Sequence, residues 1–157
     1  MLRGHRNARF KAELGRFMDG LLELKLEQIE QVTAVRRATP TNEQTAAWYA
    51  VRNKMFSLNR EGAWAAARKA KEGAWSATRS AGGGDVLFSY AAFDAVLGLG
   101  LRDVLESDHY ETLTKPMSQM MPWLMGCAHS IPAPSLRTGR SYSGGSWKQR
   151  LQKGELT

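Results

Sequence analysis

The sequence EGAWAAARKAK at residues 61–71 is followed directly by EGAWSATRSAG at residues 72–82, and seven of the eleven positions are identical. Eleven residues make about three helical turns, so equivalent positions of the two copies return to nearly the same face of a helix. The repeat therefore predicts one continuous helix through this segment.

The two sides of this predicted helix differ in chemistry. One broad face gathers small side chains that let another helix approach closely: Ala63, Ala66, Ala67, Ala70, Ala74, Ala77 and Ala81. The neighbouring face interleaves indole rings and cations at helical spacing: Trp64, Arg68, Lys71, Trp75 and Arg79. If exposed, this stripe suits the phosphates and bases of nucleic acid, or an acidic protein surface. The alternative is that the tryptophans complete the core while the basic side chains cover them.

Helical patterns also precede the repeat. Between Asn7 and about Arg37, apolar residues recur at intervals of three and four and predict one long helix: Phe10, Leu14, Phe17, Leu21 and Leu24. Residues 22–27 also alternate like a strand, but Leu, Glu and Lys favour helix. Pro40 ends this helix, and a capping box of Thr41 and Gln44 starts the next, which runs to about Phe56.

After the repeat, three glycines at 82–84 end the helix and Asp85 caps its successor. Residues 85–105 leave almost no polar face and predict a central buried helix. A short helix capped by Asp108 should end before Pro116. The fold class is therefore all-α: residues 1–127 form an irregular bundle of about five or six helices. Residues 128–157, rich in Pro, Gly and Ser, form an extended, flexible basic tail.

Charge is unevenly distributed along the chain. The 157 residues include 22 Lys and Arg against 15 Asp and Glu, a net charge of +7. Basic blocks at 1–16, 36–79 and 137–157 alternate with acidic blocks at 17–35 and 80–136, and such blocks can dock on one another within the fold. A basic excess indicates nucleic acid or an acidic protein surface as the partner.

The tail combines cations with aromatic rings: Arg137, Arg140, Tyr142, Trp147, Lys148, Arg150 and Lys153. A flexible basic segment of this kind can follow phosphates and stack on bases. The alternative is a tail that only keeps the protein in solution.

Few residues suit catalysis or metal binding. Cys127 is the one cysteine and there are three histidines, which excludes an internal disulfide framework and a cysteine-rich zinc site. Gly98 and Gly100 lack both the preceding strand and the third glycine of a dinucleotide loop. Cys127 and His129 are a conceivable nucleophile and base without an orienting partner. We therefore expect a non-enzymatic protein with no cofactor and no metal.

No membrane span is expected. The most apolar stretch, residues 86–101, is shorter than the ~18 residues that a spanning helix needs, and it contains Asp94. Because no secretory signal is visible either, the expected location is cytoplasmic.

A methionine cluster follows Pro116 and supports an alternative function. Its members are Met117, Met120, Met121 and Met125, together with Trp123. Methionine adapts to irregular surfaces, so the cluster could dock a partner helix, although such a cluster is more often a filler of the core. The alternative is thus a protein–protein interaction module that uses this surface or the long first helix. Its partner could also be a second copy of the same chain.

The repeat at residues 61–82 is followed by the sequence RDVL at 102–105 and by HYETLTKP at 109–116. This pattern resembles the Ala/Trp-repeat helical proteins of actinobacteria and their phages over about residues 60–125. The resemblance implies a helical fold and a source in these organisms, but no activity. The repeats here are more basic than the usual Asp/Ala versions.

Taken together, these patterns predict a non-enzymatic binding protein, and the resemblance implies an actinobacterial or phage gene as its source. Its basic and aromatic face and its tail would engage nucleic acid or a machine bound to nucleic acid. If the gene is a phage gene, the location is the host cytoplasm. The alternative module would be a virion component or a host-targeting factor.

Overall fold

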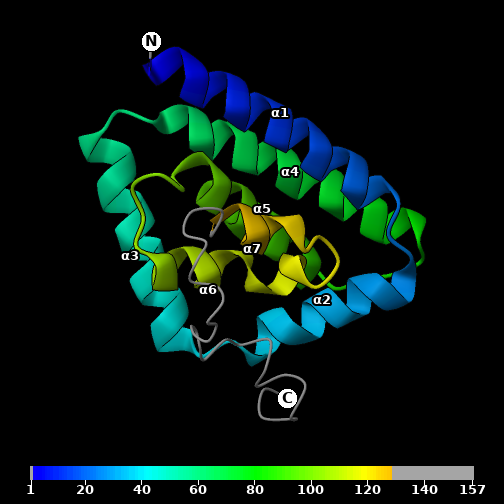
Figure 1. Cartoon of the computed structure of the whole chain (residues 1–157). Helices are drawn as coiled ribbons and strands as arrows, with labels where there is room; N and C mark the ends of the chain where they lie inside the picture. Colours follow the sequence, from blue (N-terminus) through cyan, green and yellow to red (C-terminus); the bar gives the residue numbers. More distant parts are fainter. Residues whose placement is uncertain (1, 129–157) are drawn as a thin grey trace.

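The computed structural model describes residues 2–128, and over this range the chain forms helices and no strands (Figure 1). The helices are α1 (Leu2–Leu22), α2 (Leu26–Ala38), α3 (Thr41–Ser57), α4 (Glu61–Ser80), α5 (Leu87–Gly100), α6 (Ser107–Ser118) and α7 (Trp123–Ala128). The predicted all-α bundle is confirmed. None of these helices is long and apolar enough to cross a membrane. The predictions for the tail lie outside the described residues.

Helix α5 is the centre of the bundle, as its nearly unbroken apolar sequence predicts. Eleven of its fourteen residues are buried. The helix packs most extensively against α4 and α6 and also contacts α1 and α2, so it has neighbours on all sides (Figure 1). A helix that is apolar all round is stable in this position because no face has to meet water.

The tandem repeat forms the continuous helix α4, as predicted, and four of the seven alanines of its small face are buried, whereas Ala66, Ala77 and Ala81 are partly exposed. Ala67, Ala70 and Ala74 have no exposed surface. The approach to α5 is close enough that a Cβ added to Gly100 would lie 2.7 Å from the Cβ of Ala63. Small side chains on both helices therefore allow this packing.

The prediction of one helix from Asn7 to Arg37 is wrong, because the chain turns at residues 23–25 (Figure 1). The backbone N–H groups of Glu23 and Leu24 close short turns onto Gly20 and Leu21. Both Leu21 before the turn and Ile29 after it are buried. The turn directs α2 back across α5 and α6, so that both apolar stripes reach one core.

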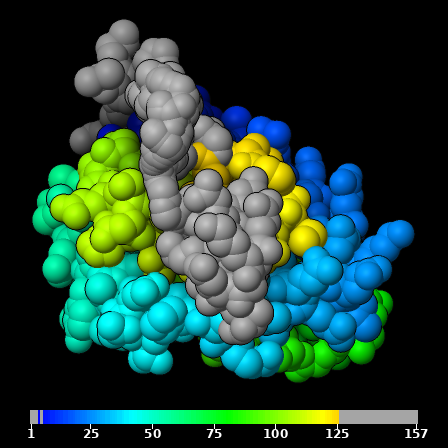
Figure 2. Space-filling model, turned by 60° about the horizontal axis from the view of Figure 1, so that its bottom comes forward, coloured from blue at the N-terminus to red at the C-terminus, as the bar shows by residue number. Residues whose placement is uncertain are grey.

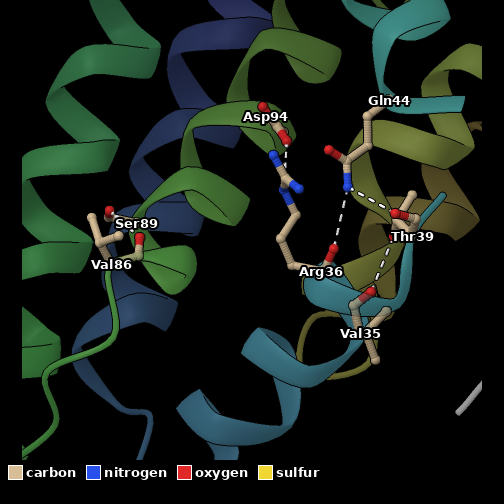
Figure 3. A network of polar contacts seen from close by, with 7 residues as sticks. All are labelled: Val35, Arg36, Thr39, Gln44, Val86, Ser89 and Asp94. Carbon is tan, nitrogen blue, oxygen red and sulfur yellow. Dashed lines mark hydrogen bonds and ion pairs between the residues drawn. The ribbon is translucent and has the colours of Figure 1, made fainter. Parts of the chain in front are cut away.

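The turn from α2 to α3 is held by Gln44, which acts differently from the predicted capping box. Its Nε2 donates to the carbonyl oxygens of Arg36 (3.3 Å) and Thr39 (3.1 Å), as Figure 3 shows. Pro40 occupies the N-cap position, and no side chain caps this helix. Gln44 therefore satisfies carbonyls at the end of α2 instead of amides at the start of α3.

Helix α6 continues past Pro116 to Ser118, so the predicted end before the proline is wrong. Pro116 lies in the last turn, where it removes one helical hydrogen bond without breaking a following helix. The Ser118 hydroxyl donates to the carbonyl of Lys115 (2.9 Å) and supports this turn.

Helices α6 and α7 lie between α3 and α1 on the face that Figure 2 shows. The Tyr110 hydroxyl donates to the carbonyl oxygen of Leu124 (2.8 Å) in a buried position. This bond joins the start of α6 to α7 and closes that side of the bundle.

We expect Gly82→Ala to destabilise the fold by about 1 kcal/mol. Gly82 ends α4 with φ of +92°, a conformation that strains any residue with a Cβ. The matched control is Gly84→Ala, since a Cβ there would meet nothing within 4 Å. Urea unfolding of both variants measures the difference, and an equal loss for both would contradict the role given to Gly82.

Candidate functional site

Three aromatic rings from three helices form a cluster beneath the surface between α3 and α4. Trp48 of α3 stacks on Phe93 of α5, with centroids 5.5 Å apart and planes at 12°. Trp64 of α4 meets Phe93 edge-on at 5.0 Å and Trp48 at 6.0 Å. Because Trp64 packs here against the core, it belongs to the ring cluster and is only partly exposed.

The predicted stripe on α4 is thus divided by the fold. Arg68 and Arg79 are exposed, as the hypothesis of an outward basic face requires. Lys71 is half-buried, with its Nζ 4.9 Å from the centre of the Tyr90 ring. Trp75 is half-buried like Trp64. Two of the three cations, Arg68 and Arg79, are therefore more accessible than the indole rings.

A shallow hollow of about 560 Å³ lies between α1 and α4. Its floor consists of Leu14 and two alanines of the repeat, and its charged side chains are Arg68, Lys69 and Glu72. Neither Arg68 nor Lys69 has an ion-pair partner among the described residues. The two alanines add little bulk beside the cations, so an anion can approach Arg68 and Lys69 closely.

A deeper groove of about 670 Å³ lies between α3 and α4, above the ring cluster. The side chains of Tyr49 and Phe56 on its α3 side are 58% and 60% exposed. Sequence reasoning did not select these residues or Trp48. The signal was present, because Tyr49 and Phe56 are seven residues apart on a helix and flank Arg52.

Five arginines of the described residues form ion pairs, and four of them bind an acid from a different charge block. These pairs confirm that the charge blocks dock on one another. Arg60 binds both carboxylate oxygens of Asp103 (2.7 and 3.0 Å), and Arg102 binds both oxygens of Glu13 (2.8 and 3.0 Å). Arg37 pairs with Asp85. These pairs leave the bundle with less free basic surface than its composition indicates.

The remaining cross-block pair is buried. Arg36 of α2 reaches Asp94 of α5, with Nε 3.1 Å from Oδ2 (Figure 3). Burial raises the pKa of Asp94 to about 7, although Arg36 and Trp48 oppose the shift. The other carboxylate oxygen, Oδ1, has no hydrogen-bond partner among the described residues. The pair therefore ties α2 to the centre of the bundle.

The methionine cluster is mainly a core element. Met117 and Met121 are buried, whereas Met120 and Trp123 are partly buried and pack against the core. Arg16 of α1 lies over the Trp123 ring, with Cζ 4.5 Å from its centre. Met125 is also partly buried. The fold therefore gives little exposed methionine surface to a partner.

The clearest group of possible metal ligands among the described residues is Glu106, Asp108 and His109, whose ligand atoms lie within 4.8 Å of one another. Both carboxylates are exposed at the start of α6, where the positive end of the helix dipole favours anions over cations. The hypothetical pair of Cys127 and His129 lies outside the described side chains, as do the predicted tail residues.

No protein-family model, curated protein or solved structure matches this chain.

Proposed function

We propose that the protein is a non-enzymatic binding protein. Its α1–α4 hollow contacts the phosphates of nucleic acid, either of free nucleic acid or of nucleic acid that is held in a larger machine. The observation that carries the proposal is the position of Arg68 and Lys69. Both line the hollow without an ion-pair partner among the described residues, while four other arginines of the bundle pair with acids of another charge block.

The shape of the hollow supports a phosphate backbone as its ligand. Ala65 and Ala66 leave space between the two helices, and the cations stand beside this space. Cations that contact phosphates give affinity that falls steeply with salt and carries little sequence selectivity. Base stacking on Trp64 receives no support, because this ring packs against Trp48 and Phe93.

The basic tail extends the same proposal, with its cations adding phosphate contacts and Tyr142 and Trp147 available to stack on bases. A cytoplasmic location, in the host if the gene belongs to a phage, is part of the proposal.

We expect the full chain to bind a fluorescein-labelled single-stranded oligonucleotide with an affinity that falls between about 50 and 200 mM salt. Arg68→Gln combined with Lys69→Gln should weaken binding about tenfold. It should also lower the slope of log K against log salt by about 1.4, since ~0.7 counterions are released per contact. Fluorescence anisotropy measures both quantities.

The matched control removes the same charge from other helices. Lys25→Gln with Lys54→Gln neutralises two exposed lysines, one at the N-cap position before α2 and one on α3. Glu72→Gln should have the opposite effect and strengthen binding, because it removes the acid in the hollow. If the α4 pair and the control pair weaken binding equally, the hollow is not the phosphate site.

A further inference from the structure

The groove between α3 and α4 contains apolar surface that no other described helix covers. The two helices leave the connection at residues 58–60 in different directions, and α3 packs mainly on α6 (Figure 1). The groove of about 670 Å³ remains between them. It shares Ala65 and Arg68 with the α1–α4 hollow, and its other lining residues are its own.

The base of the groove is held in place before any ligand arrives. Trp48 and Trp64 line it, and both rings pack on Phe93, which is 5% exposed. Buried Val51 and Met55 support the α3 side. A surface fixed in this way loses little conformational entropy when a partner binds.

The rim adds exposed aromatic surface. Tyr49 and Phe56 are more than half exposed and lie two helical turns apart on the same side of α3. Exposed single hydrophobic residues are ordinary, but two such rings beside an apolar groove form a contiguous patch. Patches of this kind are typical of interaction sites.

The charges at the groove indicate the chemistry of its partner. Arg52 of α3 and Arg68 of α4 are exposed on opposite sides, and neither has an ion-pair partner among the described residues. Glu61 contributes the one acid of the lining. Two cations around an apolar base complement a ligand with apolar and acidic faces.

The dimensions fit a helix. The groove follows α3 from Gln44 to Phe56, a length of about 18 Å at ~1.5 Å per residue. This length matches about three turns of a partner helix. Helices that dock in grooves insert apolar side chains at i, i+3, i+4 and i+7, which corresponds to the two-turn spacing of the rim rings.

We propose that the α3–α4 groove binds an acidic amphipathic helix of a partner protein. Apolar side chains of that helix pack on Trp48, Trp64 and Phe56. Its carboxylates pair with Arg52 and Arg68. Nucleic acid fits this surface less well, because most of the lining is apolar and offers phosphates only two cations.

The test is a display library of helical 16-residue peptides with random side chains, selected on the full chain. Peptides that also bind the variant Tyr49→Ser with Phe56→Ser are removed. We expect the enriched peptides to carry apolar residues at helical spacing and a net negative charge. The strongest of them should bind the wild-type chain at least tenfold more tightly than the ring variant in fluorescence anisotropy.

Charge reversal supplies the second arm. Arg52→Glu should weaken the selected peptide at least tenfold, and a peptide with lysine in place of one glutamate should regain affinity for this variant. Arg79→Glu, an exposed position on α4 outside the groove and without an ion-pair partner among the described residues, is the matched control. The Arg52→Glu variant keeps Arg68 and Lys69, the two cations of the hollow. It should therefore lose the selected peptide but still bind the oligonucleotide, which separates this proposal from the function proposed for the hollow.

Three outcomes would overturn the proposal. The first is a selection that enriches basic peptides or peptides without helical spacing. The second is the absence of any peptide that depends on Tyr49 and Phe56. The third is self-association of the wild-type chain in sedimentation that the ring variant abolishes, since the groove would then be filled by a second copy.

Discussion

Ala70→Leu is expected to lower the free energy of unfolding by about 3 kcal/mol. Ala70 has no exposed surface and lies on the face of α4 that packs against α5. Leucine adds three carbon atoms where the two helices are in close contact, so either the helices separate or the side chain adopts a strained rotamer. A protein of this size is stable by only about 5–15 kcal/mol, so the loss will be large in urea unfolding.

Ala65→Leu is the matched control, because it makes the same change on the same helix at an exposed position. Both variants keep a good helix former, so helix propensity hardly changes between them. The control should stay within about 0.5 kcal/mol of the wild type. If Ala70→Leu is equally harmless, the alanine face does not set the distance between α4 and α5.

The repeat illustrates what sequence reasoning could establish in this protein. Periodicity placed α4 correctly and identified Ala67, Ala70 and Ala74 as the side that packs inward. It could not decide whether the tryptophans face solvent. That depends on Phe93 of α5, which reaches Trp64 only because the connection at residues 81–86 brings α5 back along α4. Local spacing contains no information about this contact.

The break between α1 and α2 shows a second limit. Leu, Glu and Lys all favour helix at residues 22–27, and no glycine or proline marks a turn. The chain nevertheless turns there because Leu21 and Ile29 both have to reach the core. Tertiary packing outweighed helix propensity, which contributes only tenths of a kcal/mol per residue.

The candidate site was less predictable than the fold. Five tryptophans and 22 basic residues indicate a binding protein, but the sequence cannot show which arginines have partners. Arg60 and Arg102 are each held by a carboxylate more than forty residues away in the sequence. Only the fold shows that Arg52 and Arg68 stay free of ion pairs among the described residues.

Arg36→Met is expected to destabilise the fold by about 2 kcal/mol at pH 8 but by only about 1 kcal/mol or less at pH 5. Asp94 is buried and its pKa is raised from 3.8 to about 7, so it is mainly ionised at pH 8 and mainly protonated at pH 5. Arg36 is the cation that pairs with this carboxylate. Methionine fills a similar volume but leaves the buried carboxyl group without a cation, so ionising Asp94 becomes more costly in the variant.

The sign follows from proton linkage. Because the folded state holds the proton of Asp94 more tightly than the unfolded state, this group favours folding at low pH. That contribution is lost as the pH rises from about 4 to about 7. Removal of Arg36 takes away a partner that lowers the pKa, so the pKa of Asp94 rises further. The cost of the substitution must therefore grow with pH, as urea unfolding at the two pH values will measure.

Arg37→Met is the matched control on the neighbouring residue. Arg37 also pairs with an aspartate, but its side chain is 60% exposed and that of Asp85 is 44% exposed. A surface pair of this kind contributes at most about 1 kcal/mol. The pKa of Asp85 is lowered, mainly because its carboxylate accepts a hydrogen bond from the backbone N–H of Leu87. The carboxylate thus stays ionised from pH 5 to pH 8, and the effect of this control should not change with pH. Equal losses at both pH values for Arg36→Met would show that Asp94 does not change its charge in this range, and that Arg36 stabilises the bundle only by packing.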